Sequence, residues 1–258
     1  MEKNKQNSQK KFSYRQEFFS FCLGIFVIAL LIQILGKAKG NPLVFPDIFE
    51  ICRAFFRLMI TPKTYQCILT TLLHLVTALI LSFLAGILTG IAQGASSFLR
   101  KTLAPLMIML RSIPVIVLVV IIMLLTDYSK VPYIASTLVL IPVISEAVCE
   151  GFLNIDKDLI DVYRLNSSFS PRILFSVYLP LMTGFLRQAF INTIGMGMKI
   201  IVSSEYLVQT KNSLGKAIYS SSYFNDYQDI YAYALIMILT GILLTKLPIF
   251  IIKKVTEN

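Results

Sequence analysis

Five charged side chains lie within or at the edges of the long apolar segments of this chain: Arg111, Glu146, Arg187, Lys199 and Glu205. A charge at membrane depth costs about 2.5–3.5 kcal/mol on insertion scales, so each such residue suggests a function by default. Two uses stay open. The charges line a path for a charged solute, or they pair and hold helices together. In the second case Glu146 would pair with Arg187 or Lys199, and Glu205 would pair with Lys199.

A proline interrupts the apolar segment that carries Arg111. Pro114 has no amide hydrogen, and it disfavours the helical conformation at Ile113. The carbonyl groups freed by this break must face protein or water, because lipid offers no hydrogen-bond donor. The sequence therefore predicts a kink that either lines a pathway or packs inside the protein while Arg111 extends to the interface. Pro114 joins the five charged residues as our candidate set for a translocation pathway.

Catalytic and metal-binding patterns are scarce. His74 is the only histidine, so we expect a neutral, hydrogen-bonded helix residue rather than part of a metal site, and no metal is predicted. The four cysteines form no Cys-x-x-Cys pair, and the phosphate-binding G-x-x-x-x-G-K-[ST] motif does not occur. Asp156, Asp158 and Asp161 form the one acidic cluster. That cluster leaves open a membrane enzyme such as a lipid transferase, although we predict no catalytic residue.

Composition places these residues in a membrane protein. Apolar residues make up 56% of the 258 residues and charged residues 15%, whereas soluble domains have about 45–50% and about 25%. The net charge is +10. Its Lys and Arg are dispersed, which indicates membrane orientation and anionic lipid rather than nucleic acid. These values exclude a soluble enzyme and a secreted disulfide-rich domain.

Apolar stretches of about 20 residues, the length that crosses a bilayer, predict an all-α polytopic membrane protein with about six transmembrane helices. The expected spans are 18–36, 67–92, 103–125, 131–150, 172–202 and 229–252. Lys and Arg are more frequent in the connections on the side of the N-terminus, which places both termini in the cytoplasm. Gly86, Gly90 and Gly94 recur every four residues and predict a close helix-packing face on the second span.

Two connections between the spans are long. Residues 37–65 include an amphipathic stretch, 48–60, that we expect along the outer membrane interface. Residues 151–171 include a short amphipathic helix on the cytoplasmic side, which is either a partner-binding element or an interfacial helix without a partner. We therefore divide the chain into an N-terminal anchor with an outer segment, 1–65, and a core, 66–258, that contains this loop.

The loop resembles that of the membrane-spanning permease subunits of binding-protein-dependent ABC importers, in their nitrate, sulfonate and taurine branch. The family's signature is Glu-Ala-Ala, three residues, Gly, nine residues, Ile, one residue, Leu-Pro. This chain keeps the spacing with Asp161-Val162-Tyr163, Ser167, Val177 and Leu179-Pro180. Ser167 replaces a glycine that would permit a positive φ, so we expect a different local bend. The resemblance extends over about residues 40–252.

The resemblance implies a homodimer in the cytoplasmic membrane, whose two subunits form a pathway for a small anionic solute such as a sulfonate, nitrate or taurine. A separate ABC ATPase would bind ATP and receive the 157–170 helix, and an extracytoplasmic solute-binding protein would deliver the solute. This chain would then need no cofactor of its own. An ion-coupled secondary transporter is the alternative, favoured if the helix proves dispensable. The expected ATPase-coupling residues are Asp156, Leu159, Asp161, Val162, Tyr163, Arg164 and Ser167.

Overall fold

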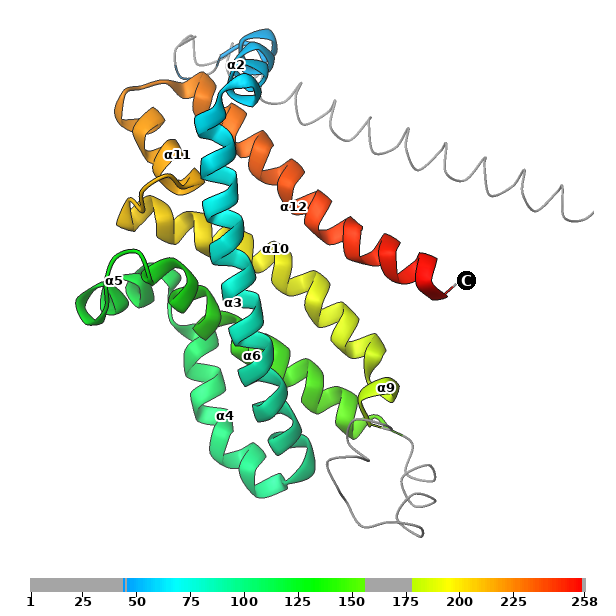
Figure 1. Cartoon of the computed structure of the whole chain (residues 1–258). Coiled ribbons are helices and arrows are strands. Elements are labelled where there is room, and N and C mark those ends of the chain that lie inside the picture. The colour runs from blue at the N-terminus through cyan, green and yellow to red at the C-terminus, as the bar shows by residue number, and fades with distance from the viewer. Residues whose placement is uncertain (1–43, 45, 156–177, 257–258) are drawn as a thin grey trace, which may run out of the picture. The chain divides into compact units, whose positions relative to one another are not determined.

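The computed structural model describes residues 44, 46–155 and 178–256, and every regular element in these ranges is a helix (Figure 1). Contacts divide the chain into two units. The first unit is Met1–Ile60 with Ser221–Ala232, and the second is Thr61–Ser220 with Tyr233–Asn258. The all-helical prediction therefore holds for the described part of the chain.

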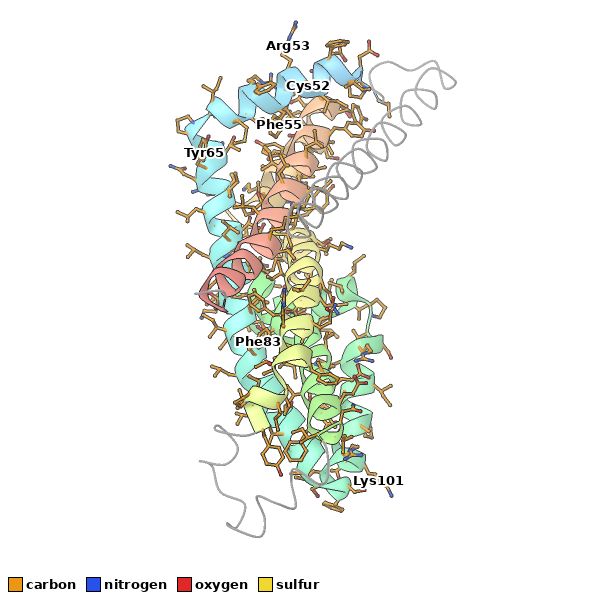
Figure 2. The ribbon with its side chains drawn as sticks, turned by 90° about the vertical axis from the view of Figure 1, so that its right-hand side faces the viewer. Cys52, Arg53, Phe55, Tyr65, Phe83 and Lys101 are labelled. Carbon is orange, nitrogen blue, oxygen red and sulfur yellow. The ribbon has the colours of Figure 1, made fainter. Side chains whose placement is uncertain are left out.

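The second unit is built around α3 (Pro62–Ala95), which begins with a proline, where a missing amide hydrogen is harmless. α3 carries no charged residue after Lys63. The helices α6 (Val131–Leu153) and α10 (Thr183–Val208) pack against α3 and against each other. Figure 2 shows Tyr65, near the start of α3, and Lys101, near the start of the next helix, at opposite ends of this bundle.

The predicted glycine face of α3 lies against α6, within the subunit. A Cβ atom on Gly86 would lie 2.7 Å from Cβ of Ile144, and one on Gly90 would lie 2.6 Å from the carbonyl oxygen of Ser145. Gly94 has equally little room. Because real Cβ atoms do not approach other atoms this closely, a side chain at any of the three positions would force the two helices apart.

A sharp break separates α4 (Ser97–Ser112) from α5 (Val115–Leu125), which meet at 101°. Ile113 and Pro114 between them have ψ angles of 126° and 131°, which are outside the helical region. The interruption predicted at Pro114 is therefore present, as a break between two helices that together remain one candidate span. The physical reason is the steric restriction that Pro114 imposes on the residue before it.

Three helices in the described part of the chain are long and apolar enough to cross a membrane: α3, α6 and α12 (Tyr227–Thr256). In α12 the qualifying stretch is Tyr227–Lys246. The bent pair α4–α5 is a fourth candidate if it forms one span. The expected span 18–36 and the start of the fifth, 172–177, lie outside the described residues. α10, the described part of the fifth, is not among the candidates.

Aromatic packing joins the ends of the predicted cytoplasmic loop. The ring of Phe152, near the end of α6, stacks on Tyr178 with ring centroids 4.7 Å apart. Tyr178 directly precedes the short helix α9 (Leu179–Leu181), and it is buried in a cluster with Val148 and Met182. The chain therefore leaves α6 and returns toward α10 at neighbouring points.

The first unit contains α2 (Ile48–Ile60), the helix predicted over 48–60. It also contains the last residues of α11 (Leu214–Tyr223) and the first of α12. Arg57 on α2 forms an ion pair with Asp229 at the start of α12. Phe49 and Phe56 expose apolar surface on α2, in keeping with the predicted amphipathic character.

Candidate functional site

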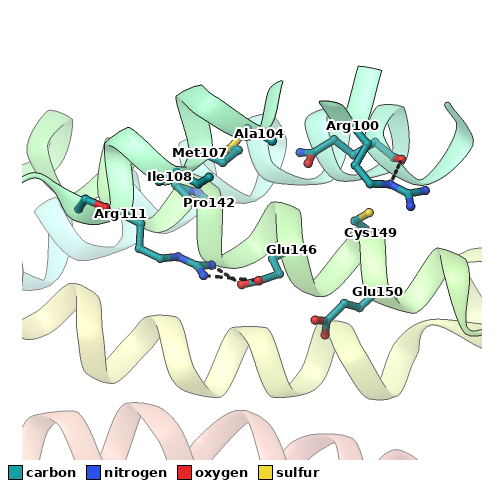
Figure 3. A pocket seen from close by; sticks show the side chains of 11 residues that line it. Arg100, Ala104, Met107, Ile108, Arg111, Pro142, Glu146, Cys149 and Glu150 are labelled. Carbon is teal, nitrogen blue, oxygen red and sulfur yellow. Dashed lines mark hydrogen bonds and ion pairs between the residues drawn. The ribbon is translucent and has the colours of Figure 1, made fainter. Parts of the chain in front are cut away.

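A cavity of about 350 Å³ lies between α4 and α6, with one residue from α3 (Figure 3). This volume lies within the range of about 300–1,000 Å³ that is typical of small-molecule sites. Charges of both signs face the cavity from two helices. Its polar lining consists of Gln93 on α3, Arg100, Arg111 and Ser112 on α4, and Glu146, Cys149 and Glu150 on α6.

An ion pair between Arg111 and Glu146 connects α4 to α6 across this cavity (Figure 3). Nη2 of Arg111 bonds Oε2 of Glu146, and Nη1 lies 3.4 Å from Oε1, so the pair is bidentate. Arg111 lies in the last turn of α4, where the helix dipole favours a positive charge. The two side chains are 51% and 52% exposed. Both charges are therefore accessible to a molecule that enters the cavity.

The other end of the cavity is anchored to α3. Nε of Arg100 donates to the backbone carbonyl of Gln93 at 3.0 Å, and Nε2 of Gln93 donates to Oγ of Ser145 at 2.7 Å. Gln93 is buried. These bonds fix Arg100 beside the cavity and link α3, α4 and α6 through polar groups at one place.

Arg100, Gln93 and Glu150 are absent from the residues predicted by sequence. A signal for two of them exists. Glu146 and Glu150 are four residues apart, and Arg100 and Arg111 are eleven apart, which is about three helical turns. Each pair therefore shares one helix face, and the opposite charges of the two faces would favour contact between these helices.

Glu205 occupies a second polar cluster, in which it is fully buried. Its Oε2 accepts a hydrogen bond from Oγ1 of Thr71 at 2.8 Å and from the backbone amide of Gly215 at 3.2 Å. Its Oε1 lies 2.8 Å from Nδ1 of His74, which donates because a carboxylate only accepts. The expected pairing with Lys199 is thus wrong, whereas His74 is hydrogen-bonded as expected.

The structure separates the remaining pathway candidates. The ion pair of Glu146 is with Arg111, so the expected pairing of Glu146 with Arg187 or Lys199 is wrong. Arg187 and Lys199 are exposed on α10 and do not line the cavity. Pro114 is exposed at the break just beyond Arg111.

The predicted ATPase-coupling residues lie outside the described residues, in 156–177. They are Asp156, Leu159, Asp161, Val162, Tyr163, Arg164 and Ser167. Within the described ranges, no group of three or more His, Cys, Asp or Glu side chains is placed to hold a metal ion.

Comparison with known proteins gives the fold and the family. Among curated protein sequences no match is found. A solved structure of the MetNI methionine ABC transporter, in inward-facing conformations, is similar to this chain with a TM-score of 0.58 and 18% sequence identity. The match covers 76% of this chain and 97% of that chain, and at this identity it establishes the fold alone.

The family match covers residues 82–256, which is more than half of the chain. Its description is "Binding-protein-dependent transport system inner membrane component". That description implies a solute-binding protein and a separate ATPase that hydrolyses ATP as partners. The chain belongs to this family of ABC importer permeases: it is a multi-pass inner-membrane subunit of a transporter and not an enzyme.

Proposed function

We propose that this permease subunit imports a small solute with an acidic group, and that the cavity between α4 and α6 is part of the translocation pathway. The observation that carries the proposal is the Arg111–Glu146 pair, which is half-exposed at the break between α4 and α5. About half of each side chain is exposed, so neither the guanidinium group nor the carboxylate is enclosed by its partner. An accessible pair can exchange its partner for a charged solute.

The charges that line the cavity favour a solute that carries both a positive and a negative group. Two guanidinium groups, Arg100 and Arg111, face two carboxylates, Glu146 and Glu150. Complementary potential therefore suits a small molecule that carries an amino group as well as an acidic group. Taurine-like sulfonates meet this condition, and nitrate does not.

The wider architecture follows from the resemblance in the loop. We propose a homodimer with six spans per subunit, both termini in the cytoplasm, and an ATPase that docks on the 157–170 helix. The Phe152–Tyr178 stack supports this role, because it joins the end of α6 to the residue before α9. A movement of the loop that follows ATP binding would then be transmitted to α6 and α10.

Co-purification tests the transporter class first. The chain would be expressed with candidate ATPase subunits, including any encoded beside its gene. The double variant Asp161→Lys with Arg164→Glu should release the ATPase while the membrane subunit stays folded. A folded subunit that binds no ATPase would overturn the ABC mechanism, and uptake without any ATPase would identify an ion-coupled carrier.

Uptake into proteoliposomes that contain the reconstituted complex tests the pathway. Arg111→Gln and Glu146→Gln should each reduce uptake while the ATPase stays bound, and Arg53→Gln, at an exposed position of α2, serves as the control. Labelled taurine, an alkanesulfonate, nitrate and methionine form the solute panel. Unchanged uptake in both cavity variants would remove the cavity from the pathway.

A further inference from the structure

We propose that Glu205, Thr71 and His74 form a latch, a set of hydrogen bonds that holds the first turn of α11 against α3 and α10. The carboxylate is 0% exposed and His74 is 15% exposed, so water does not compete for these bonds. The inference does not depend on the pathway proposed above, because none of these residues lines the cavity.

The chain reverses direction just before the latch. α10 ends at Val208, Gln209 has a left-handed conformation with φ of 55°, and α11 begins at Leu214. Gly215 then touches α10 so closely that a Cβ atom there would lie 2.4 Å from Cβ of Glu205 and 2.5 Å from the carbonyl oxygen of Val202. Only a glycine permits this approach of α11 to α10.

The latch uses both carboxylate oxygens and joins three helices. Thr71 and His74 belong to α3, Glu205 to α10, and the amide of Gly215 to α11. Oγ1 of Thr71 donates to Glu205 and accepts from the amide of Leu214 at 3.0 Å, so it connects α10 to the first residue of α11. The negative charge lies at the N-terminus of α11, where the helix dipole stabilises it.

The deepest burial of α11 is at this turn, and further along the ring of Tyr219 makes an edge-to-face contact with Tyr206 of α10, with ring centroids 5.4 Å apart. Leu214 is fully buried and Gly215 has no space around it, whereas residues 216–220 are only partly buried. Residues Ser221–Ala232 then belong to the first unit, before the chain returns to the second unit at Tyr233. The latch therefore fixes the helix by which the chain leaves the second unit, and loss of the latch should free this helix while the bundle of α3, α6 and α10 stays folded.

Hydrogen exchange of the full-length protein in lipid nanodiscs, read by mass spectrometry, tests the latch. Glu205→Leu keeps a similar volume but removes both acceptors, and Glu205→Gln keeps the shape and an acceptor oxygen. In Glu205→Leu, exchange over 209–220 should become roughly tenfold faster or more, since local opening follows the loss of local bonds. Glu205→Gln should retain most of the protection.

A second pair of variants keeps the test independent of changes at Glu205. Thr71→Val removes the hydroxyl and should accelerate exchange over the same residues, while Thr71→Ser should not. Glu146→Gln, at the cavity, is the matched carboxylate control and should leave 209–220 unchanged. Exchange within twofold of wild type in both Glu205→Leu and Thr71→Val would overturn the proposal. Equal acceleration across α3, α6 and α10 would also overturn it, because Glu205 would then be a general core residue.

Discussion

Glu146 on α6 and Glu205 on α10 are both carboxylates in apolar helices, and each bonds to polar groups on another helix of the second unit. Glu146 is 52% exposed and pairs with one arginine beside a cavity. Glu205 is 0% exposed and accepts bonds from Thr71, His74 and Gly215. The carboxylate of Glu146 is accessible to another molecule. Both carboxylate oxygens of Glu205 are already occupied by hydrogen bonds within the protein. The role of a charged residue in an apolar helix therefore depends on the groups around it and not on its residue type.

The two sites also differ in what their loss should cost. Removal of the buried carboxylate leaves the donors of Thr71, His74 and Gly215 without an acceptor, and each buried unsatisfied group costs about 1–3 kcal/mol. Removal of one partner from an exposed ion pair costs about 0.2–1 kcal/mol where water reaches both charges, as it would in the proposed pathway. Stability measurements therefore separate the two uses of charge.

The largest expected effect is on stability at Glu205. Glu205→Ala should lower the free energy of unfolding by about 3 kcal/mol or more, because three buried donors lose their acceptor, and Glu146→Ala should lower it by about 1 kcal/mol or less. Reversible unfolding of the purified proteins in mixed micelles measures both. Equal losses in the two variants would remove the distinction between the sites.

Gly215 should be the next most sensitive position of the buried site. Gly215→Ala places a methyl group against the backbone of α10, which should cost about 1–3 kcal/mol through overpacking. Gly195→Ala, on α10 with open space around it, is the control and should leave stability unchanged or raise it by up to about 1 kcal/mol. The same unfolding assay applies. A neutral Gly215→Ala would show that α11 can move away without loss.

At the cavity, function should change more than stability. Arg111→Gln should alter the free energy of unfolding by about 1 kcal/mol or less. It should reduce uptake about tenfold or more, because a bond to a charged group contributes about 1.5–3 kcal/mol.

The exchanged pair Arg111→Glu with Glu146→Arg provides the control for this prediction. It should restore the ion pair and the stability, yet reduce uptake, since the charges then occupy each other's positions. Full uptake in the exchanged pair would assign Arg111 and Glu146 a purely structural role.

The smallest effect is expected in the exposed pair Asp127–Lys130, in the connection between α5 and α6. Nζ of Lys130 lies 2.9 Å from Oδ2 of Asp127, and this hydrogen bond lowers the pKa of Asp127. Because the folded-state pKa is the lower one, the pair's contribution is present above the unfolded-state pKa and is lost as pH falls through the folded-state pKa.

Lys130→Ala should return the pKa of Asp127 upward toward its ordinary value with little change in thermal stability at neutral pH. NMR titration of the carboxyl carbon of Asp127 measures the shift. A large loss of stability in this variant would contradict the ordering by exposure.

Much of the fold follows from local properties of the sequence. Helix α2, the glycine face of α3 and the break at Pro114 each depend on residues within a few turns of one another, so composition and spacing predict them. The severity of the break was not predictable, since Pro114 forbids a helical Ile113 but does not set the 101° angle between α4 and α5. That angle depends on what each helix packs against.

The sequence by itself determined the class of protein: its apolar composition requires a membrane, and its loop spacing resembles the family to which it belongs. Only the tertiary structure decided the partners of the charges. Arg111 and Glu146 are 35 residues apart, and His74 and Glu205 are 131 apart. Periodicity states which face of a helix a residue occupies and not which helix lies opposite. Pairing is decided by packing between distant segments, and here that packing leaves one carboxylate accessible and buries the other.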